Sequence, residues 1–406
     1  MTHIPSPVGQ LTDPVTHPVR RLGSLAASAS WGVFWGGWAA LLPGIKIQAG
    51  LDAPALGLAL CAIPIGAVPA MLVTGTVYDR YGRRTLGISL VLFAVAVVLP
   101  GLATGKWSLA AALLAVGATS GAIEVALNAA TAATEAATGR RLFHLVHAVT
   151  PIAMIVAAPA VGAARQAGAA PLPILLVVGA LVAVSAVVDG WSRVPAPADR
   201  SAGDHSARFR LVPTGWVLLY GLAGATVLFV ENAVEQWSAV LLDHQRGTGP
   251  FVASLGPAGY LAALAVGRMV AHRYGDGLTP GIAVTIAGIG GAAGISLAAN
   301  ASAPGLAIAG FVLAGLGNAA ALPTLLTATG RGAEANRRGA AVATVTTVSY
   351  LGFLTSPAAV GSVAGAAGLS GALGMVAALA GALAGAVLLG RVVPLRRMAS
   401  QPGRQA

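Results

Sequence analysis

The sequence predicts an all-α polytopic membrane protein with twelve transmembrane helices, and three observations lead to this prediction. The 406 residues are 56% hydrophobic and only 9% charged, with a mean hydropathy of +0.80. Soluble domains carry about 25% charged residues. Twelve apolar segments each come near the ~20 residues that a helix needs to cross the hydrocarbon core. Cationic residues fall almost entirely into alternate loops between these segments.

The twelve segments follow one another with short polar connections, whereas a transmembrane β-barrel would show alternating strands of about ten residues. Their expected limits are 22–44, 54–76, 84–105, 107–132, 142–165, 170–192, 213–241, 249–272, 277–300, 303–329, 339–365 and 369–391. A polar stretch at 193–211 divides them into six-helix halves at 21–192 and 212–392. Terminal tails at 1–20 and 393–406 complete the predicted organisation.

The distribution of charge predicts the orientation. Of 24 Lys and Arg residues, only Lys46, Lys106, Arg165 and Arg246 lie on one predicted side. Cytoplasmic loops carry an excess of Lys and Arg. We therefore expect a multi-pass protein of the cytoplasmic (inner) membrane, with both tails and the linker cytoplasmic. The net charge of +11 would suggest nucleic acid for a soluble protein, but here it lies in loops, and no nucleic-acid partner is expected.

The two halves are related by a sequence repeat. The tripeptide Arg80-Tyr81-Gly82 recurs as Arg273-Tyr274-Gly275, each time between two apolar segments. At similar spacing Trp38 matches Trp237, Arg140-Arg141 matches Arg337-Arg338, and Pro159 matches Pro357. Two related halves predict a cleft between them with a substrate site near the bilayer midplane.

Residues 75–87, GTVYDRYGRRTLG, resemble the loop 2–3 signature of the major facilitator superfamily, a Gly followed by Asp-Arg-x-Gly-Arg-Arg. The resemblance covers residues 20–392 and implies two pseudo-symmetric six-helix bundles that rock about a central site. The string ENAVEQWS at 231–238, and Gly139-Arg140-Arg141 followed by His147, are similar to the fucose-permease-like branch.

The resemblance assigns a gating latch to the loop 2–3 motif. Asp79 would lie at the N-terminus of the eleventh helix, near Gly339, where the helix dipole favours a carboxylate. Arg83 would pair with Glu135, the acid at the end of the fourth helix. Alternatively, the motif is a solvated loop that only sets topology. The expected latch residues are Gly75, Asp79, Arg80, Gly82, Arg83, Arg84 and Glu135.

A second-half motif comprises Arg268, Arg273 and Gly275. Because His272 replaces Asp79 there, its latch would be weaker or pH-dependent.

Three acids, Glu124, Glu231 and Glu235, fall inside predicted spans. A carboxylate at mid-membrane costs ~2.5–3.5 kcal/mol on insertion scales, so three facing lipid would cost about 8–10 kcal/mol. That is comparable with the net stability of a domain, so these acids should face the cleft or be paired. Intramembrane acids often serve as proton relays, which predicts Glu124, His147 and Glu231 as proton-coupling residues.

The fourth and fifth helices form an antiparallel hairpin, which places Glu124 at the depth of His147, and Asn128 at that of His144. A histidine beside a carboxylate titrates near neutral pH, so this pair is interpreted as a relay. The pair could instead be a structural lock. A metal site on Glu124, His144 and His147 would be short of ligands, and we expect neither a metal nor another cofactor.

The expected substrate site combines aromatic and polar side chains on cleft-lining helices: Trp31, Trp35, Asn128, Glu231, Asn232, Glu235, Asn318 and Tyr350. The two tryptophans share one helix face and could stack on a flat solute, or only pack between helices. Glu235 could bind solute or simply reach water.

Taken together, these features predict a secondary active transporter that moves a small organic solute by alternating access, coupled to protons as symport or antiport, and acting as a monomer in the lipid bilayer. No GxxxxGK[ST] loop occurs, so ATP is not expected to drive it. An enzyme is not expected, since there is no HExxH helix or nucleophile elbow. A membrane sensor on the same scaffold and a drug/proton exporter remain the alternatives.

Overall fold

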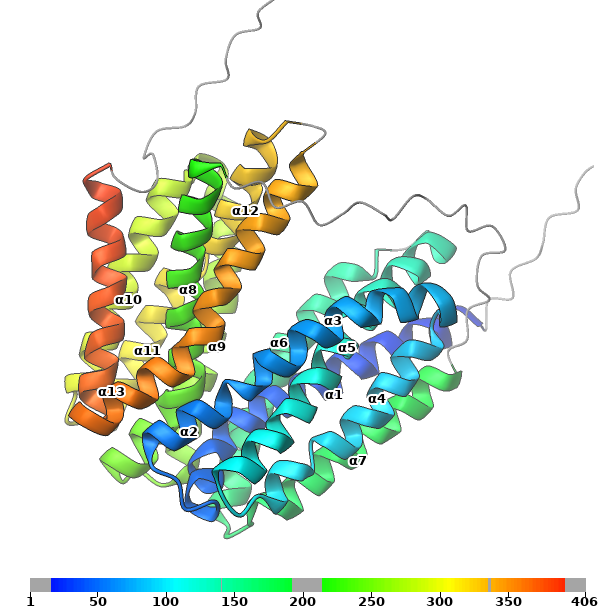
Figure 1. Ribbon diagram of the computed structural model, residues 1–406, viewed down its shortest axis with the longest axis horizontal. Coiled ribbons are helices and arrows are strands. Elements are labelled where there is room, and N and C mark those ends of the chain that lie inside the picture. The colour runs from blue at the N-terminus through cyan, green and yellow to red at the C-terminus, as the bar shows by residue number, and fades with distance from the viewer. Residues whose placement is uncertain (1–15, 140, 192–213, 335–336, 391–406) are drawn as a thin grey trace, which may run out of the picture.

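The computed structural model describes residues 16–139, 141–191, 214–334 and 337–390, and these residues contain helices and no strand. The predicted linker at 193–211 and Arg140 lie outside them. The helices are α1 Thr16–Gln48, α2 Ala53–Leu60, α3 Ala62–Tyr81, α4 Arg84–Ala96, η1 Leu99–Leu102, α5 Lys106–Thr138, α6 Phe143–Gln166, α7 Pro171–Trp191, α8 Gly215–Val240, η2 Leu241–Gln245, α9 Pro250–Tyr274, η3 Gly275–Gly277, α10 Pro280–Asn300, α11 Pro304–Asn318, α12 Ala321–Gly332 and α13 Arg338–Leu388 (Figure 1).

Within the described residues, eleven helices are long and apolar enough to cross a membrane. The first ten agree with the predicted segments to within a few residues. The eleventh, Arg338–Leu388, covers the last two predicted segments together. Gly368 interrupts it with a non-helical backbone at φ 70° and ψ 170°, which glycine adopts without the steric penalty of a side chain. This break falls between the predicted segments 339–365 and 369–391.

Small residues bring α1 and α6 into close contact. A methyl group added at Gly32 would meet the backbone of Thr150, and one added at Gly36 would meet the backbone of Met154. One turn earlier, the Ser28 hydroxyl donates a hydrogen bond of 2.6 Å to the Val146 carbonyl. Small residues at a spacing of four allow helices in a membrane to approach this closely.

Replacing Ser28 with Ala is expected to lower the free energy of unfolding by about 0.6–1.7 kcal/mol, the range for hydrogen bonds between membrane helices. The measurement is thermal unfolding of the purified protein in detergent. Ser302→Ala, at an exposed position outside the helices, is the matched control, and an equal effect of both substitutions would contradict the assigned contact.

The helices form two groups that touch mainly at one end of the molecule. Helices α1 and α3–α7 pack on one another, as do α8–α13; between the groups, α6 packs on α9, and α2 packs on α13. In Figure 1 the groups meet where α2 lies and diverge toward the end where α7 stops and α8 starts. We call the first the closed end and the second the linker end.

Glycines make the contact at the closed end tight. A methyl group on Gly361 of α13 would meet the Ala53 carbonyl and Gly57 of α2, and one on Gly162 of α6 would meet Ser254 of α9. Both glycines follow a valine in the repeated stretches that begin at Pro159 and Pro357. The sequence repeat therefore coincides with the two surfaces that join the groups.

Candidate functional site

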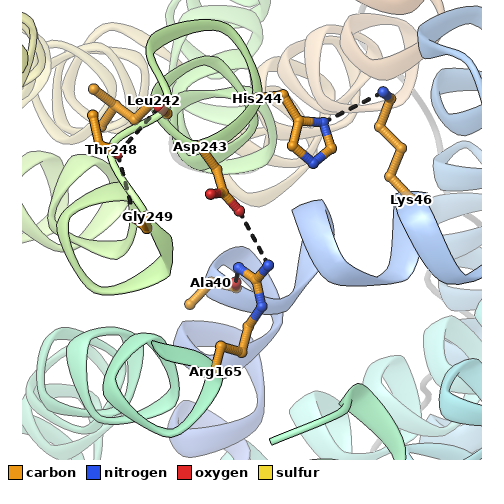
Figure 2. A network of polar contacts seen from close by, with 8 residues as sticks. All are labelled: Ala40, Lys46, Arg165, Leu242, Asp243, His244, Thr248 and Gly249. Atoms are coloured by element: carbon orange, nitrogen blue, oxygen red, sulfur yellow. Dashed lines mark hydrogen bonds and ion pairs between the residues drawn. The ribbon is translucent and has the colours of Figure 1, made fainter. Parts of the chain in front are cut away.

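The closed end carries a network of polar contacts between the two groups (Figure 2). The Arg165 guanidinium, at the end of α6, forms a 3.1 Å ion pair with the Asp243 carboxylate in η2, and also donates to the Ala40 carbonyl at 2.9 Å. Both charged side chains are nearly buried, 8% and 13% exposed. Beside them, Lys46 Nζ lies 3.4 Å from His244 Nδ1. These four charged or titratable residues are the closed-end network.

A change of helix geometry presents the second half of this network. At Leu241 the α8 helix gives way to the π-helical turn η2, which contains Asp243 and His244. Thr248 supports its exit by donating to the Leu242 carbonyl at 3.1 Å. Single π-helical turns occur frequently at functional sites, and this one carries Asp243 to α6 and His244 to α1.

Four predicted site residues line one small pocket in the first group of helices. The pocket has a volume of about 120 Å³, and Trp31, Glu124, Asn128 and His147 are among its lining residues. The hairpin of α5 and α6 therefore brings Glu124 and His147 to one place. No hydrogen bond or ion pair joins these two side chains among the described residues. His144 is exposed and does not line this pocket.

The two tryptophans of α1 share a partner on α5. Trp31 Nε1 donates to the Ser120 hydroxyl at 2.8 Å, and Trp35 Nε1 donates to the same oxygen at 3.2 Å. Trp35 also packs edge-on against Phe34. Of the two, Trp31 borders the pocket, and Trp35 packs between helices.

A second acidic centre lies on α8. Glu231 Oε2 is 3.9 Å from Arg268 Nη2 on α9, and Glu235, one turn along α8, is within electrostatic range of both. Two carboxylates therefore share one arginine. The Tyr350 hydroxyl of α13 is within electrostatic range of both Glu231 and Glu124.

Asn232 and Gln236 lie next to this centre on α8, and both are buried. Their side-chain oxygens have no hydrogen-bond partner among the described residues. Buried acceptors are nearly always satisfied in native proteins, so these two oxygens call for a water, a ligand or another conformation to supply a donor.

Asn318 has a different role in the structure. Its Nδ2 donates to the Val227 carbonyl at 3.1 Å and to the Tyr260 hydroxyl at 2.9 Å. It thus ties α11 to α8 and α9 inside the second group, and its amide is already satisfied there.

The loop 2–3 motif corrects one predicted contact. Arg83 pairs with Asp189 of α7 at 2.5 Å and donates to the Thr134 hydroxyl at 3.2 Å. It does not pair with Glu135, as the resemblance implied. Glu135 Oε1 instead accepts the backbone N–H groups of Leu142 and Phe143 at 2.6 and 3.2 Å. The carboxylate caps the start of α6, where helix N–H groups otherwise lack partners.

The remaining motif residues lie at the linker end. A methyl group added at Gly75 would meet nothing within 4 Å, Gly82 turns the chain at φ 59°, and Asp79, Arg80 and Arg84 are exposed. The end of α3 and the start of α13 lie apart in Figure 1, so the expected latch between Asp79 and the region of Gly339 is not formed in this conformation.

The second-half motif repeats one contact of the first. Arg80 stacks on Tyr81 at 5.5 Å, and Arg273 stacks on Tyr274 at 5.4 Å. Gly275 follows with φ −85°, unlike Gly82. Arg268 makes a contact of a different kind, because its side chain extends between the helices toward Glu231.

Comparison with known proteins agrees with this architecture. A sequence profile of the Major Facilitator Superfamily matches residues 22–357. An uncharacterized MFS-type transporter from Yersinia pestis is 32% identical over 348 residues, covering 84% of this chain and 88% of that protein. The crystal structure of a mutant of the nucleoside transporter NupG superposes with a TM-score of 0.77 at 14% identity, covering 91% of this chain and 99% of that one. A crystal structure of the E. coli fucose:proton symporter FucP gives 0.58 at 17% identity, covering 92% and 98%.

Proposed function

Because the chain belongs to the Major Facilitator Superfamily, we propose that this membrane transporter is a secondary active one that carries a small organic solute by alternating access and couples it to protons. The structural observation that supports this proposal is that the Tyr350 hydroxyl is within electrostatic range of both the Glu124 and the Glu231 carboxylate. The first acid belongs to the first group of helices and the second acid to the second group, so a solute held there contacts both groups.

The proposed topology has twelve spans in two six-helix bundles, with the chain reversing at Gly368. The excess of Lys and Arg in the loops of the linker end supports a cytoplasmic location for that end. The conformation described above is then inward-facing, and the closed-end network seals the opposite face. Both termini are cytoplasmic in this arrangement, and the protein works as a monomer.

The solute site is completed only when the two groups approach each other. Small-molecule sites usually enclose about 300–1,000 Å³, whereas the pocket at Glu124 holds about 120 Å³. Trp31 and Asn128 hold one side of the solute in this proposal, and Tyr350, Glu231 and Glu235 supply the other side after closure at the linker end. Asn232 supplies a further acceptor.

Protonation controls that closure. The three carboxylates of Glu124, Glu231 and Glu235, with one arginine beside them, leave two negative charges near the middle of the membrane. These charges oppose the approach of the two groups of helices, since each costs ~2.5–3.5 kcal/mol when it leaves water. A proton on Glu124, exchanged through His147, removes one charge. Arg268 balances one of the two carboxylates on α8, so a second proton or a solute donor is needed for the other.

Uptake into proteoliposomes tests this function directly. The reconstituted protein is presented with a panel of solutes, including nucleosides and fucose, and uptake is measured with and without an imposed gradient of one pH unit. One proton per solute across that gradient supplies about 1.4 kcal/mol, or roughly tenfold accumulation. Accumulation that follows the gradient supports the proposal, and the absence of uptake for every solute that thermally stabilises the protein would favour a sensor.

Glu124→Gln is expected to abolish the roughly tenfold solute accumulation that a gradient of one pH unit supplies. Solute exchange without a gradient should continue, because glutamine keeps the shape of the side chain but takes up no proton. Glu334→Gln, an exposed acid at the linker end, is the control. Unchanged gradient-driven accumulation in Glu124→Gln would show that this carboxylate does not carry the proton.

The drug/proton exporter is the second candidate. The stretch from Pro159 to Gly162 resembles the fifth-helix Gly-Pro motif of drug/proton exporters in that superfamily, but Ala158 and Ala163 stand where glycines are expected. The direction of solute movement under an opposing proton gradient distinguishes it from an importer.

A further inference from the structure

A second, larger pocket opens at the linker end of the second group of helices. Its volume is about 670 Å³, and it lies between the starts of α8 and α10 and the ends of α9 and α12. It is separate from the pocket at Glu124, which is lined by α1, α5 and α6.

Among the side chains that the structure describes around this linker-end pocket, the charged ones are two arginines. Arg268, His272 and Arg331 line it, and no Asp or Glu is among its lining residues in the described part of the chain. Glu231, which lies 3.9 Å from Arg268, is not among the residues that line the pocket. Two guanidinium groups around a cavity favour an anion, and planar guanidinium groups match the oxygens of phosphate well.

Two uncharged features of the pocket, the Tyr220 hydroxyl and the start of α10, also favour an anion. Tyr220 lines the pocket and is only 6% exposed, yet its hydroxyl has no hydrogen-bond partner among the described residues. Thr279 and Pro280, which begin α10, also line it. The start of a helix carries partial positive charge and accepts anions. A tyrosine hydroxyl, a helix start and two arginines therefore line one cavity.

The sequence repeat allows the linker-end pocket to be compared with the equivalent region of the first half. In the first half, Arg83 lies between α4, α5 and α7, held by Asp189 and the Thr134 hydroxyl. At the spacing that separates Arg80 from Arg273, Thr134 corresponds to Thr327, which lines the linker-end pocket. The last helical stretch, 369–388, contains no acid to match Asp189, and the described side chains around the pocket form no ion pair like that of Arg83 with Asp189.

We propose that the linker-end pocket binds a phosphate group, carried either by an anionic lipid or by a soluble phosphorylated compound. The guanidinium groups of Arg268 and Arg331 hold the phosphate oxygens, and the Tyr220 hydroxyl donates to one of them. Because Arg268 also faces Glu231, a bound phosphate competes with that acid for the same cation. The pocket is thereby a regulatory site that acts on the acidic centre of α8, and its occupancy does not depend on which solute is carried.

The test is calorimetric titration of the purified full chain in detergent with four probes. Dioctanoyl phosphatidylglycerol represents the lipid source, glycerol 3-phosphate and inorganic phosphate represent the soluble source, and dioctanoylglycerol lacks phosphate. We expect saturable binding of at least one phosphate probe and none of dioctanoylglycerol. Binding of the phosphatidylglycerol alone identifies a lipid site, and binding of the soluble probes identifies a site for a soluble phosphate.

Two substitutions localise the binding. Arg331→Gln is expected to weaken it about tenfold or more, and Tyr220→Phe, which removes only the hydroxyl, about two- to tenfold. The matched control is Arg337→Gln, which removes the same charge from a residue that pairs with Glu334 and does not line the pocket. Failure of every phosphate probe to saturate, or equal weakening by Arg331→Gln and Arg337→Gln, would overturn the proposal.

Discussion

Replacing Asp243 with Asn is expected to move the protein away from the conformation that is shut at the closed end. The substitution removes the negative charge that balances the nearly buried Arg165, and the guanidinium keeps only neutral acceptors, the new amide oxygen and the Ala40 carbonyl. Breaking a fully buried ion pair costs about 3–5 kcal/mol, and an exposed pair contributes about 0–1 kcal/mol. The exposures of these two side chains lie between those cases, so we expect about 1–3 kcal/mol, a shift of about 5- to 150-fold in the conformational equilibrium.

The single cysteine reports this shift without any engineering. Cys61 Sγ lies 3.6 Å from the Leu354 carbonyl, where the α2–α3 junction faces α13. Separation of the groups at the closed end exposes this thiol, so a membrane-impermeant thiol reagent should label it faster in Asp243→Asn cells. Asp52→Asn removes a charge at the same end and keeps an oxygen to cap α2, which makes it the control.

A charge exchange completes the experiment. Arg165→Asp combined with Asp243→Arg restores opposite charges across the same gap and should return Cys61 labelling toward the native rate. If Asp243→Asn labels no faster than Asp52→Asn, the ion pair does not hold the closed end.

Replacing Gly361 with Leu is expected to prevent closure altogether. The first added carbon would already meet the Ala53 carbonyl and Gly57. These are backbone atoms, so rotation of a side chain cannot relieve the clash. Overpacking commonly costs 1–3 kcal/mol even where side chains adjust, and here α2 and α13 have to separate. Solute uptake should be lost, and Cys61 should be labelled at its maximal rate.

The partner glycine gives an independent check of that contact. Gly57→Leu meets the Pro357 carbonyl and Gly361 from the other side and should have the same effect. Gly374→Leu lies in the last helical stretch with nothing nearby and should behave as the native protein. Membrane yield and gel filtration establish that each variant folds. Native uptake in Gly361→Leu would mean that α2 and α13 never need to touch.

The sequence predicted the helices well because lipid imposes a simple rule on length and hydropathy. Boundaries came within a few residues, and even the break at Gly368 fell between two predicted segments. The antiparallel hairpin also predicted that Glu124 and His147 lie close together, since depth in a membrane follows position along each helix.

Contacts between distant helices were harder to predict. The expected pair of Arg83 with Glu135 was wrong because α4 runs beside α7, which brings Asp189 to Arg83, while Glu135 turns to the start of α6. Asp189 was overlooked because it lies in the last turn of its helix, where an acid could equally reach water.

The closed-end network was missed for a related reason. Lys46 and Arg165 were noted only as exceptions to the charge distribution, yet a cation on the side that carries few of them needs an anionic partner. Asp243 was available on that side, but the turn η2 that carries it to α6 has no recognisable sequence signal.

The central claim is that opening at one end accompanies closing at the other, and distances between pairs of spin labels test it most directly. In a Cys61→Ser background, one pair replaces exposed Arg84 and Arg338 at the linker end, and the other replaces exposed Ile47 and Gln245 at the closed end. Distances are measured in lipid nanodiscs between about pH 8 and about pH 5, the range in which histidine titrates, with and without stabilising solutes. A second population in which the first distance shortens while the second lengthens is the predicted result. Two distances that stay fixed under every condition, or that change in the same direction, would contradict it.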